Sequence, residues 1–108
     1  MSSIERTAFP RFPKKRKIKQ AELNRLYSIT HDELKMIKSH ANTDKSRLNI
    51  AIQLKTFQAL GYFITLDKVP HEVVNHIRQS LQLHYRSSYG YSGNNKSLYR
   101  HRDKIRTY

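Results

Sequence analysis

The chain has 108 residues, and its formal net charge is +13, from 21 Lys and Arg against 8 Asp and Glu. This length supports one small domain with a single core. The absence of cysteine excludes disulfides and the usual structural zinc sites, and no apolar run approaches the ~18 residues of a membrane-spanning helix.

The charge is concentrated at the two ends of the chain. Residues 1–19 carry a net +6 and residues 84–108 a net +5, whereas the residues between them are nearly balanced. Cationic ends suit a polyanionic partner, because each neutralised phosphate releases condensed counterions. The chain accordingly divides into four parts: a basic arm (1–17), a helical domain (18–83), a linker (84–95) and the start of a further helical unit (96–108).

The arm is predicted to lack regular structure because Pro10, Pro13 and closely spaced cations disfavour it. Its densest cluster of cations consists of Arg11, Lys14, Lys15, Arg16, Lys17 and Lys19. Such a cluster is similar to a homeodomain arm, which follows phosphates or enters a minor groove. A disordered solubilising tail fits the same residues, and P-K-K-R-K also has the form of a nuclear-import signal.

Two short helices are expected next. Residues 18–27 have apolar side chains at helical spacing. The sequence T-H-D-E, from Thr30 to Glu33, then forms a capping box, in which the first and fourth residues each cap the other's backbone N–H. The helix that it opens should extend to about His40, with Leu34 and Ile37 facing the core.

The longest helix is predicted to run from Thr43 or Asp44 to Leu60. Its apolar residues cover more of its circumference than a surface helix requires. Gly61 stands where a left-handed C-terminal cap belongs. The polar positions that remain form one stripe, at Asn49, Gln53 and Thr56.

The short connection at residues 41–44 predicts a helix-turn-helix-like centre, with Lys45, Arg47, Asn49 and Gln53 pointing outward. In a major groove, Asn and Gln pair with adenine and Arg pairs with guanine. The same helix equally fits a core element with one ordinary solvated stripe. Both interpretations remain open from the sequence.

After a connector at residues 62–68, Pro70 suits the first turn of a further helix, where its missing N–H has no helical partner. The predicted buried stripe of this helix is Val73, Val74, Ile77 and Leu81. Residues 85–95 contain two glycines, three serines and two asparagines, which are typical of a loop or linker.

A last helix is expected to begin after Ser97 as its cap, with Leu98, His101 and Ile105 on one side. Its cations, among them Lys96, Arg100 and Lys104, suit contacts with DNA phosphates. The tyrosines interleaved with them suit stacking on single-stranded RNA as well, and docking on a further domain also fits. Because the pattern stops within an amphipathic helix, we expect the sequence to be the beginning of a longer protein, with a frayed terminal helix as the alternative.

No catalytic site, metal site or cofactor is predicted. The eight carboxylates are spread along the chain and most stand at helix starts, where the macrodipole favours them. Two-metal chemistry requires carboxylates that converge. His71 and His76 are five residues apart rather than the four that place two ligands on one helix face. We therefore expect a binding module rather than an enzyme.

Four strings of residues resemble the N-terminal region of transposases of the large replicative bacterial transposons of the Tn-three type. They are Leu26-Tyr27-x-Ile29-Thr30, Arg47-Leu48-x-x-Ala51-x-Gln53-Leu54, Leu60-Gly61-x-Phe63 and Val69-Pro70-x-x-Val73-Val74. The resemblance covers about residues 18–83. One departure is Asn49, where the family's motif usually has glycine, so the close packing at that point is open.

The resemblance implies recognition of the terminal inverted repeats of a transposon, with the metal-dependent catalytic core far downstream in the full transposase. The expected fold is all-α, a small bundle of about five helices with a helix-turn-helix-like centre and a basic N-terminal arm. The expected partners are double-stranded DNA and the remainder of the transposase chain. The expected location is the bacterial cytoplasm, at the nucleoid when the protein is bound to DNA, and oligomerisation of the full-length protein is left open. A small RNA- or ribosome-associated protein and a transposase interaction module are the competing classes.

Overall fold

The computed structural model describes residues 18–91 and 96–108. Within these ranges the protein is all-α and has no strand. The α-helices are α2 (Gln20–Tyr27), α3 (His31–His40), α4 (Asp44–Leu60), α5 (His71–Ser80) and α6 (Lys96–Thr107), and a 3-10 turn, η1 (Leu66–Lys68), lies between α4 and α5. The predicted all-α fold of about five helices is confirmed, while the arm predicted at residues 1–17 lies outside the described residues.

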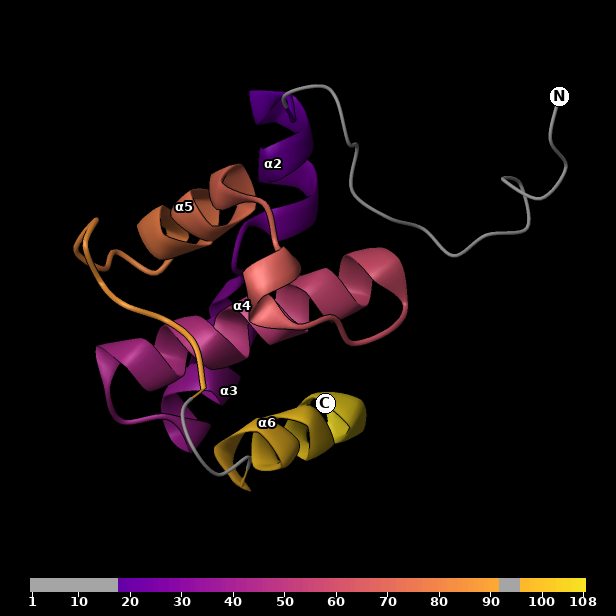
Figure 1. Cartoon of the computed structure of the whole chain (residues 1–108), viewed down its shortest axis with the longest axis vertical. Coiled ribbons are helices and arrows are strands. Elements are labelled where there is room, and N and C mark those ends of the chain that lie inside the picture. The colour runs from indigo at the N-terminus through magenta and orange to yellow at the C-terminus, as the bar shows by residue number, and fades with distance from the viewer. Residues whose placement is uncertain (1–17, 92–95) are drawn as a thin grey trace, which may run out of the picture.

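Helix α4 is the centre of the fold. Figure 1 shows it crossing the middle of the molecule, with α2 and α5 on one side and α6 on the other. It packs against each of these helices, against α3 and against η1, and α2 also packs against α5. Every residue from Leu48 to Thr56 is buried. A helix surrounded in this way is apolar around most of its circumference, which explains the weak sidedness of its sequence.

The predicted helix ends are confirmed at three positions. Thr30 Oγ1 accepts a hydrogen bond from Glu33 N at 3.2 Å, and Glu33 Oε1 accepts one from Thr30 N at 2.9 Å, which completes the capping box at α3. Thr43 caps α4, and its Oγ1 accepts from Ser46 N at 3.1 Å. Gly61 ends α4 at a φ of 83°, a left-handed conformation that glycine adopts without steric cost.

Two local predictions are wrong, one for Leu34 and one for Ser97. In α3 Ile37 faces the core as predicted, but the other buried apolar residue is Met36, and Leu34 is only half-buried. Ser97 lies inside the first turn of α6, which begins at Lys96, rather than before the helix. The first error arises because an apolar pattern fixes a helical face less sharply than packing against a neighbour does, and the second because the start of a helix is uncertain by one or two residues.

Candidate nucleic-acid interface

A chain of side-chain hydrogen bonds fastens α6 to α4. Arg102 Nε donates to Gln53 Oε1 at 3.1 Å, and Gln53 Nε2 donates to the Tyr91 hydroxyl at 2.8 Å. That hydroxyl lies 2.6 Å from Nδ1 of His101. The guanidinium can only donate, which fixes the orientation of the Gln53 amide, whereas the roles of the Tyr91 hydroxyl and His101 Nδ1 follow from the tautomer of the imidazole.

A second set of bonds attaches the segment before α6 to the same helix. Asn49 Nδ2 donates to the Gly90 carbonyl at 3.0 Å, and Gly90 N donates to Asn49 Oδ1 at 2.6 Å. The Asn49 amide thus satisfies both backbone groups of Gly90. Figure 1 shows how this segment returns across α4 after α5. The carboxamides of α4 therefore serve as a binding surface for the chain itself.

The predicted outward orientation is wrong for Asn49 and Gln53. The two residues are only 4% and 1% exposed, respectively. The returning segment and α6 cover the polar stripe of α4, and a polar stripe looks the same in sequence whether water or a second segment covers it. The interpretation of α4 as a core element is the one that its burial supports. Arg47 is half-buried, and its Nε donates to the Ala41 carbonyl at 3.0 Å.

Helix α6 presents a row of cations to solvent. Lys96, Arg100 and Lys104 are all exposed and follow one another at intervals of four residues, so they share one flank of the helix. The buried face is defined by His101 and Ile105. We call Lys96, Arg100 and Lys104 the α6 cationic row.

The other cations of α6 lie on its opposite flank and are engaged. The guanidinium carbons of Arg102 and Arg106 are each 5.1 Å from the centroid of the Phe63 ring. Arg106 also forms an ion pair with Asp103 at 3.0 Å. These contacts place the guanidinium groups of Arg102 and Arg106 near the Phe63 ring, on the flank opposite the α6 cationic row.

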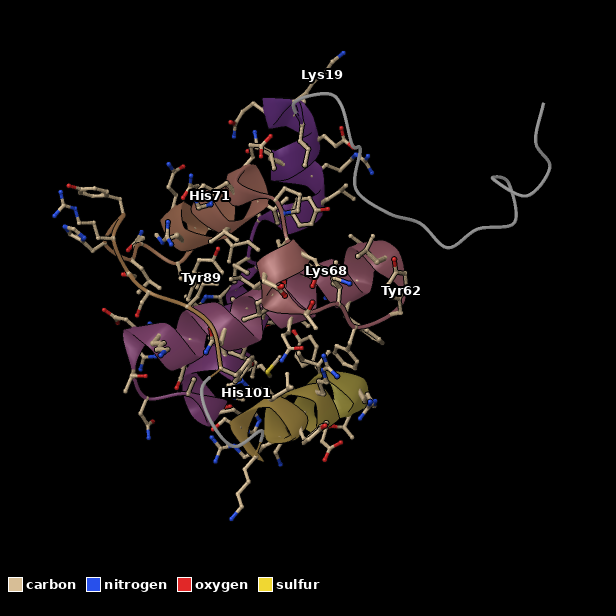
Figure 2. The ribbon with its side chains drawn as sticks, in the orientation of Figure 1. Lys19, Tyr62, Lys68, His71, Tyr89 and His101 are labelled. Atoms are coloured by element: carbon tan, nitrogen blue, oxygen red, sulfur yellow. The ribbon has the colours of Figure 1, made fainter. Side chains whose placement is uncertain are left out.

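A polar cleft of about 340 Å³ lies between the start of α4 and α6. It is lined by Thr43, Lys45, Ser46, Asn49, Gly90, Tyr91, Ser97 and His101. We call it the α4–α6 cleft. In Figure 2, His101 stands on the side of α6 that is turned toward α4. Through this cleft the exposed Lys45 is brought next to the flank of α6 that bears the cationic row.

Burial keeps the groups in this region neutral. It lowers the pKa of His101 to about 4, with a further contribution from the charges of Arg100 and His40. Burial also raises the pKa of Tyr91 to about 12, against the opposing effects of the hydrogen bond from Gln53 and the charges of Arg102 and Arg100. The hydrogen-bond chain therefore has one protonation state across the physiological range.

The remaining predicted contact residues are placed as follows. Lys19 is exposed and directly precedes α2. Arg11, Lys14, Lys15, Arg16 and Lys17 lie outside the described residues. Sequence reasoning placed His101 on the inner face of the last helix but missed its bond to Tyr91. The helical spacing of the sequence does not predict this bond, because Tyr91 lies outside the helix and meets His101 only in the folded chain.

Residues 18–91 and 96–108 contain no group of three or more His, Asp or Glu side chains placed to hold a metal ion. None of their helices combines the length and the apolar character that crossing a bilayer requires.

Comparison with known proteins assigns the chain to a family. The family described as "Domain of unknown function (DUF4158)" matches residues 1–108, so the chain belongs to it. Neither the curated proteins nor the solved structures include a significant match.

Proposed function

We propose that this chain binds duplex DNA as the N-terminal part of a transposase of the Tn-three type, and that it recognises the terminal inverted repeats of the transposon. The observation that carries the proposal is the α6 cationic row, which lies beside Lys45 on the outer side of the helical fold. Three exposed cations on one flank of a helix create a local positive potential that attracts phosphates. The resemblance of residues 18–83 to those transposases supports the ends of a transposon as the nucleic acid.

The geometry of the row fits a phosphate backbone. At 1.5 Å per residue, its two four-residue intervals extend over about 12 Å, which is similar to the rise of three to four nucleotides along one strand. Lys and Arg at such spacing form charge-assisted contacts to phosphates along one strand. We therefore assign the row and Lys45 to backbone contacts, which position a protein on DNA without reading its sequence.

Sequence recognition is not assigned to α4. Asn49 and Gln53 use their amides for Gly90, Tyr91 and Arg102, so neither is available for a base edge. The arm cations from Arg11 to Lys19 are proposed to add phosphate or minor-groove contacts, as their density suggests. In this arrangement α4 supports the segments that contact DNA and does not itself enter a groove.

Fluorescence anisotropy with three labelled probes tests the proposal: a duplex of the transposon's terminal inverted repeat, a scrambled duplex of equal composition and a single-stranded RNA of equal length. We expect the tightest binding to the inverted repeat at ~150 mM salt, and a steep loss of affinity for every probe as salt rises. Equal or tighter binding to the scrambled duplex or the RNA contradicts the assignment.

One observation favours the RNA-binding alternative and makes the third probe necessary. Tyr85 and Tyr99 are 69% and 59% exposed, and exposed aromatic rings next to cations suit stacking on unpaired bases. The ring of Tyr85 already stacks on His84 at 4.5 Å, and the Arg86 guanidinium is 5.3 Å from its centroid. Because these neighbours occupy part of the ring, duplex DNA remains the preferred partner.

A further inference from the structure

The His101 side chain contains a buried ring nitrogen, Nε2, that has no hydrogen-bond partner. Because Gln53 Nε2 already donates to the Tyr91 hydroxyl, we assign the phenolic hydrogen to the contact with His101 Nδ1, which then accepts it. The neutral ring then carries its own hydrogen on Nε2. This atom is buried and has no partner, in a residue that is only 1% exposed.

An unsatisfied buried donor costs roughly 1–3 kcal/mol, and native proteins rarely retain one without a reason. Here the ring belongs to the wall of the α4–α6 cleft, whose volume of about 340 Å³ is sufficient for a group of several atoms. Exposed side chains of Lys45 and Ser97 also line this cleft. They lie in the same wall as His101 and add polar groups to it.

The charges nearest the cleft are mainly positive. Lys45 lines it directly, and the charge of Arg100 adds to the effect of burial in lowering the pKa of His101. Thr43 and Ser46 bring the first turn of α4, where backbone N–H groups point outward and the helix dipole is positive. Asp44, also in that turn, is exposed and is not among the lining residues.

We propose that the α4–α6 cleft binds one phosphate group, with Nε2–H of His101 and the ammonium of Lys45 as its principal donors. The hydroxyls of Ser46 and Ser97 are the neutral donors within the same cleft. That the phosphate is one of the DNA backbone rests on the proposed function; that the cleft takes a phosphate does not. Bound there, a phosphate would lie beside the α6 cationic row and fix the register of the strand along it.

The test follows the imidazole nitrogens of His101 by ¹⁵N NMR at pH 7 while inorganic phosphate is added, with sodium chloride of equal ionic strength as the reference. We expect the neutral tautomer with hydrogen on Nε2, and a saturable shift of that resonance with phosphate alone. Lys45→Ala should weaken phosphate binding on the order of tenfold, since it removes a charge-assisted contact. Lys68→Ala, which removes an exposed cation from η1, should leave it unchanged.

Identical responses to phosphate and chloride would overturn the proposal, and so would an Nδ1–H tautomer in the free protein. The duplex titration is read separately with the same variants. Phosphate binding without any duplex affinity would retain the cleft and reject DNA as the source of the phosphate. Duplex affinity that Lys45→Ala and Lys68→Ala lower equally, together with no phosphate response, would retain DNA binding and reject the cleft.

Discussion

Lys55 Nζ lies 3.0 Å from Oε1 of Glu33, in the interior of the protein, where the two side chains are only 7% and 8% exposed. The same carboxylate accepts a bond from Gln58 Nε2 at 2.8 Å and caps the backbone N–H of Thr30. One side chain thus closes the first turn of α3 and joins that helix to α4. An ion pair costs desolvation when it is buried, but here each carboxylate oxygen has hydrogen-bond donors.

Glu33→Gln is expected to lower the free energy of unfolding by about 3–5 kcal/mol, because the Lys55 ammonium stays buried without a counter-charge. Urea unfolding followed by circular dichroism measures the loss. Asp103→Asn is the matched control, since it breaks the exposed ion pair with Arg106 and should cost less than about 1 kcal/mol. Equal effects of the two substitutions would show that the buried pair contributes nothing particular.

Acid is expected to destabilise the fold through His101. Its folded pKa of about 4 is below the unfolded value of 6.5, so the unfolded chain takes up the proton first as the pH falls. The contribution of His101 to the free energy of unfolding is complete above pH 6.5 and is lost progressively as the pH falls toward 4. At pH 5 this single group accounts for about 2 kcal/mol.

The comparison for this pH effect is His101→Gln, which has no titrating group at that position. Its unfolding free energy should fall less between pH 7 and pH 5 than that of the unsubstituted protein. His76, whose pKa is also lowered by burial, acts in the same direction but is present in both proteins. Parallel pH profiles would therefore contradict the assignment to His101.

Asn49→Ala should destabilise the protein by about 1–3 kcal/mol and weaken binding to every DNA sequence equally. The substitution leaves the N–H and the carbonyl of Gly90 without their partner. Gln79→Ala, at an exposed position of α5, is a control of similar chemistry and should change stability by less than about 0.5 kcal/mol. Relaxed preference at a single base pair, with unchanged stability, would restore Asn49 as a base reader.

Replacing the α6 cationic row by Lys96→Ala, Arg100→Ala and Lys104→Ala together should flatten the dependence of log K on log salt by about 2–3, since each lost phosphate contact removes about 0.9. The row is exposed, so the melting temperature should change little. The control is a variant in which the exposed cations Arg25 and Lys68 are replaced, because it lowers the charge of the protein outside the α6 cationic row. An unchanged slope in the triple variant would show that the row does not touch DNA.

The caps of α3 and α4 were predictable because they depend on local chemistry. The hydroxyl of Thr30 and the carboxylate of Glu33 satisfy the first N–H groups of their own helix, and Gly61 adopts a conformation that other residues avoid. The central place of α4 was also readable from its apolar circumference. These properties need no knowledge of distant residues.

The environment of the polar residues in α4 was not predictable in the same way. Asn49 meets Gly90, 41 residues away, and Gln53 meets Tyr91, 38 residues away. A carboxamide binds a backbone group of the chain or a base edge with the same donors and acceptors. Which of the two partners the carboxamide meets depends on the path of the returning segment, and that path is set by the tertiary structure.

The burial of α4 on all sides has a consequence for how proteins of this kind diverge. A helix that touches each of its neighbours tolerates few substitutions, because any change of volume there is transmitted to several contacts at once. Solvent-facing positions of α6 carry no such restriction. We therefore expect the exposed side chains of α6 to differ among proteins of this family, while the sequence of α4 is inherited nearly intact.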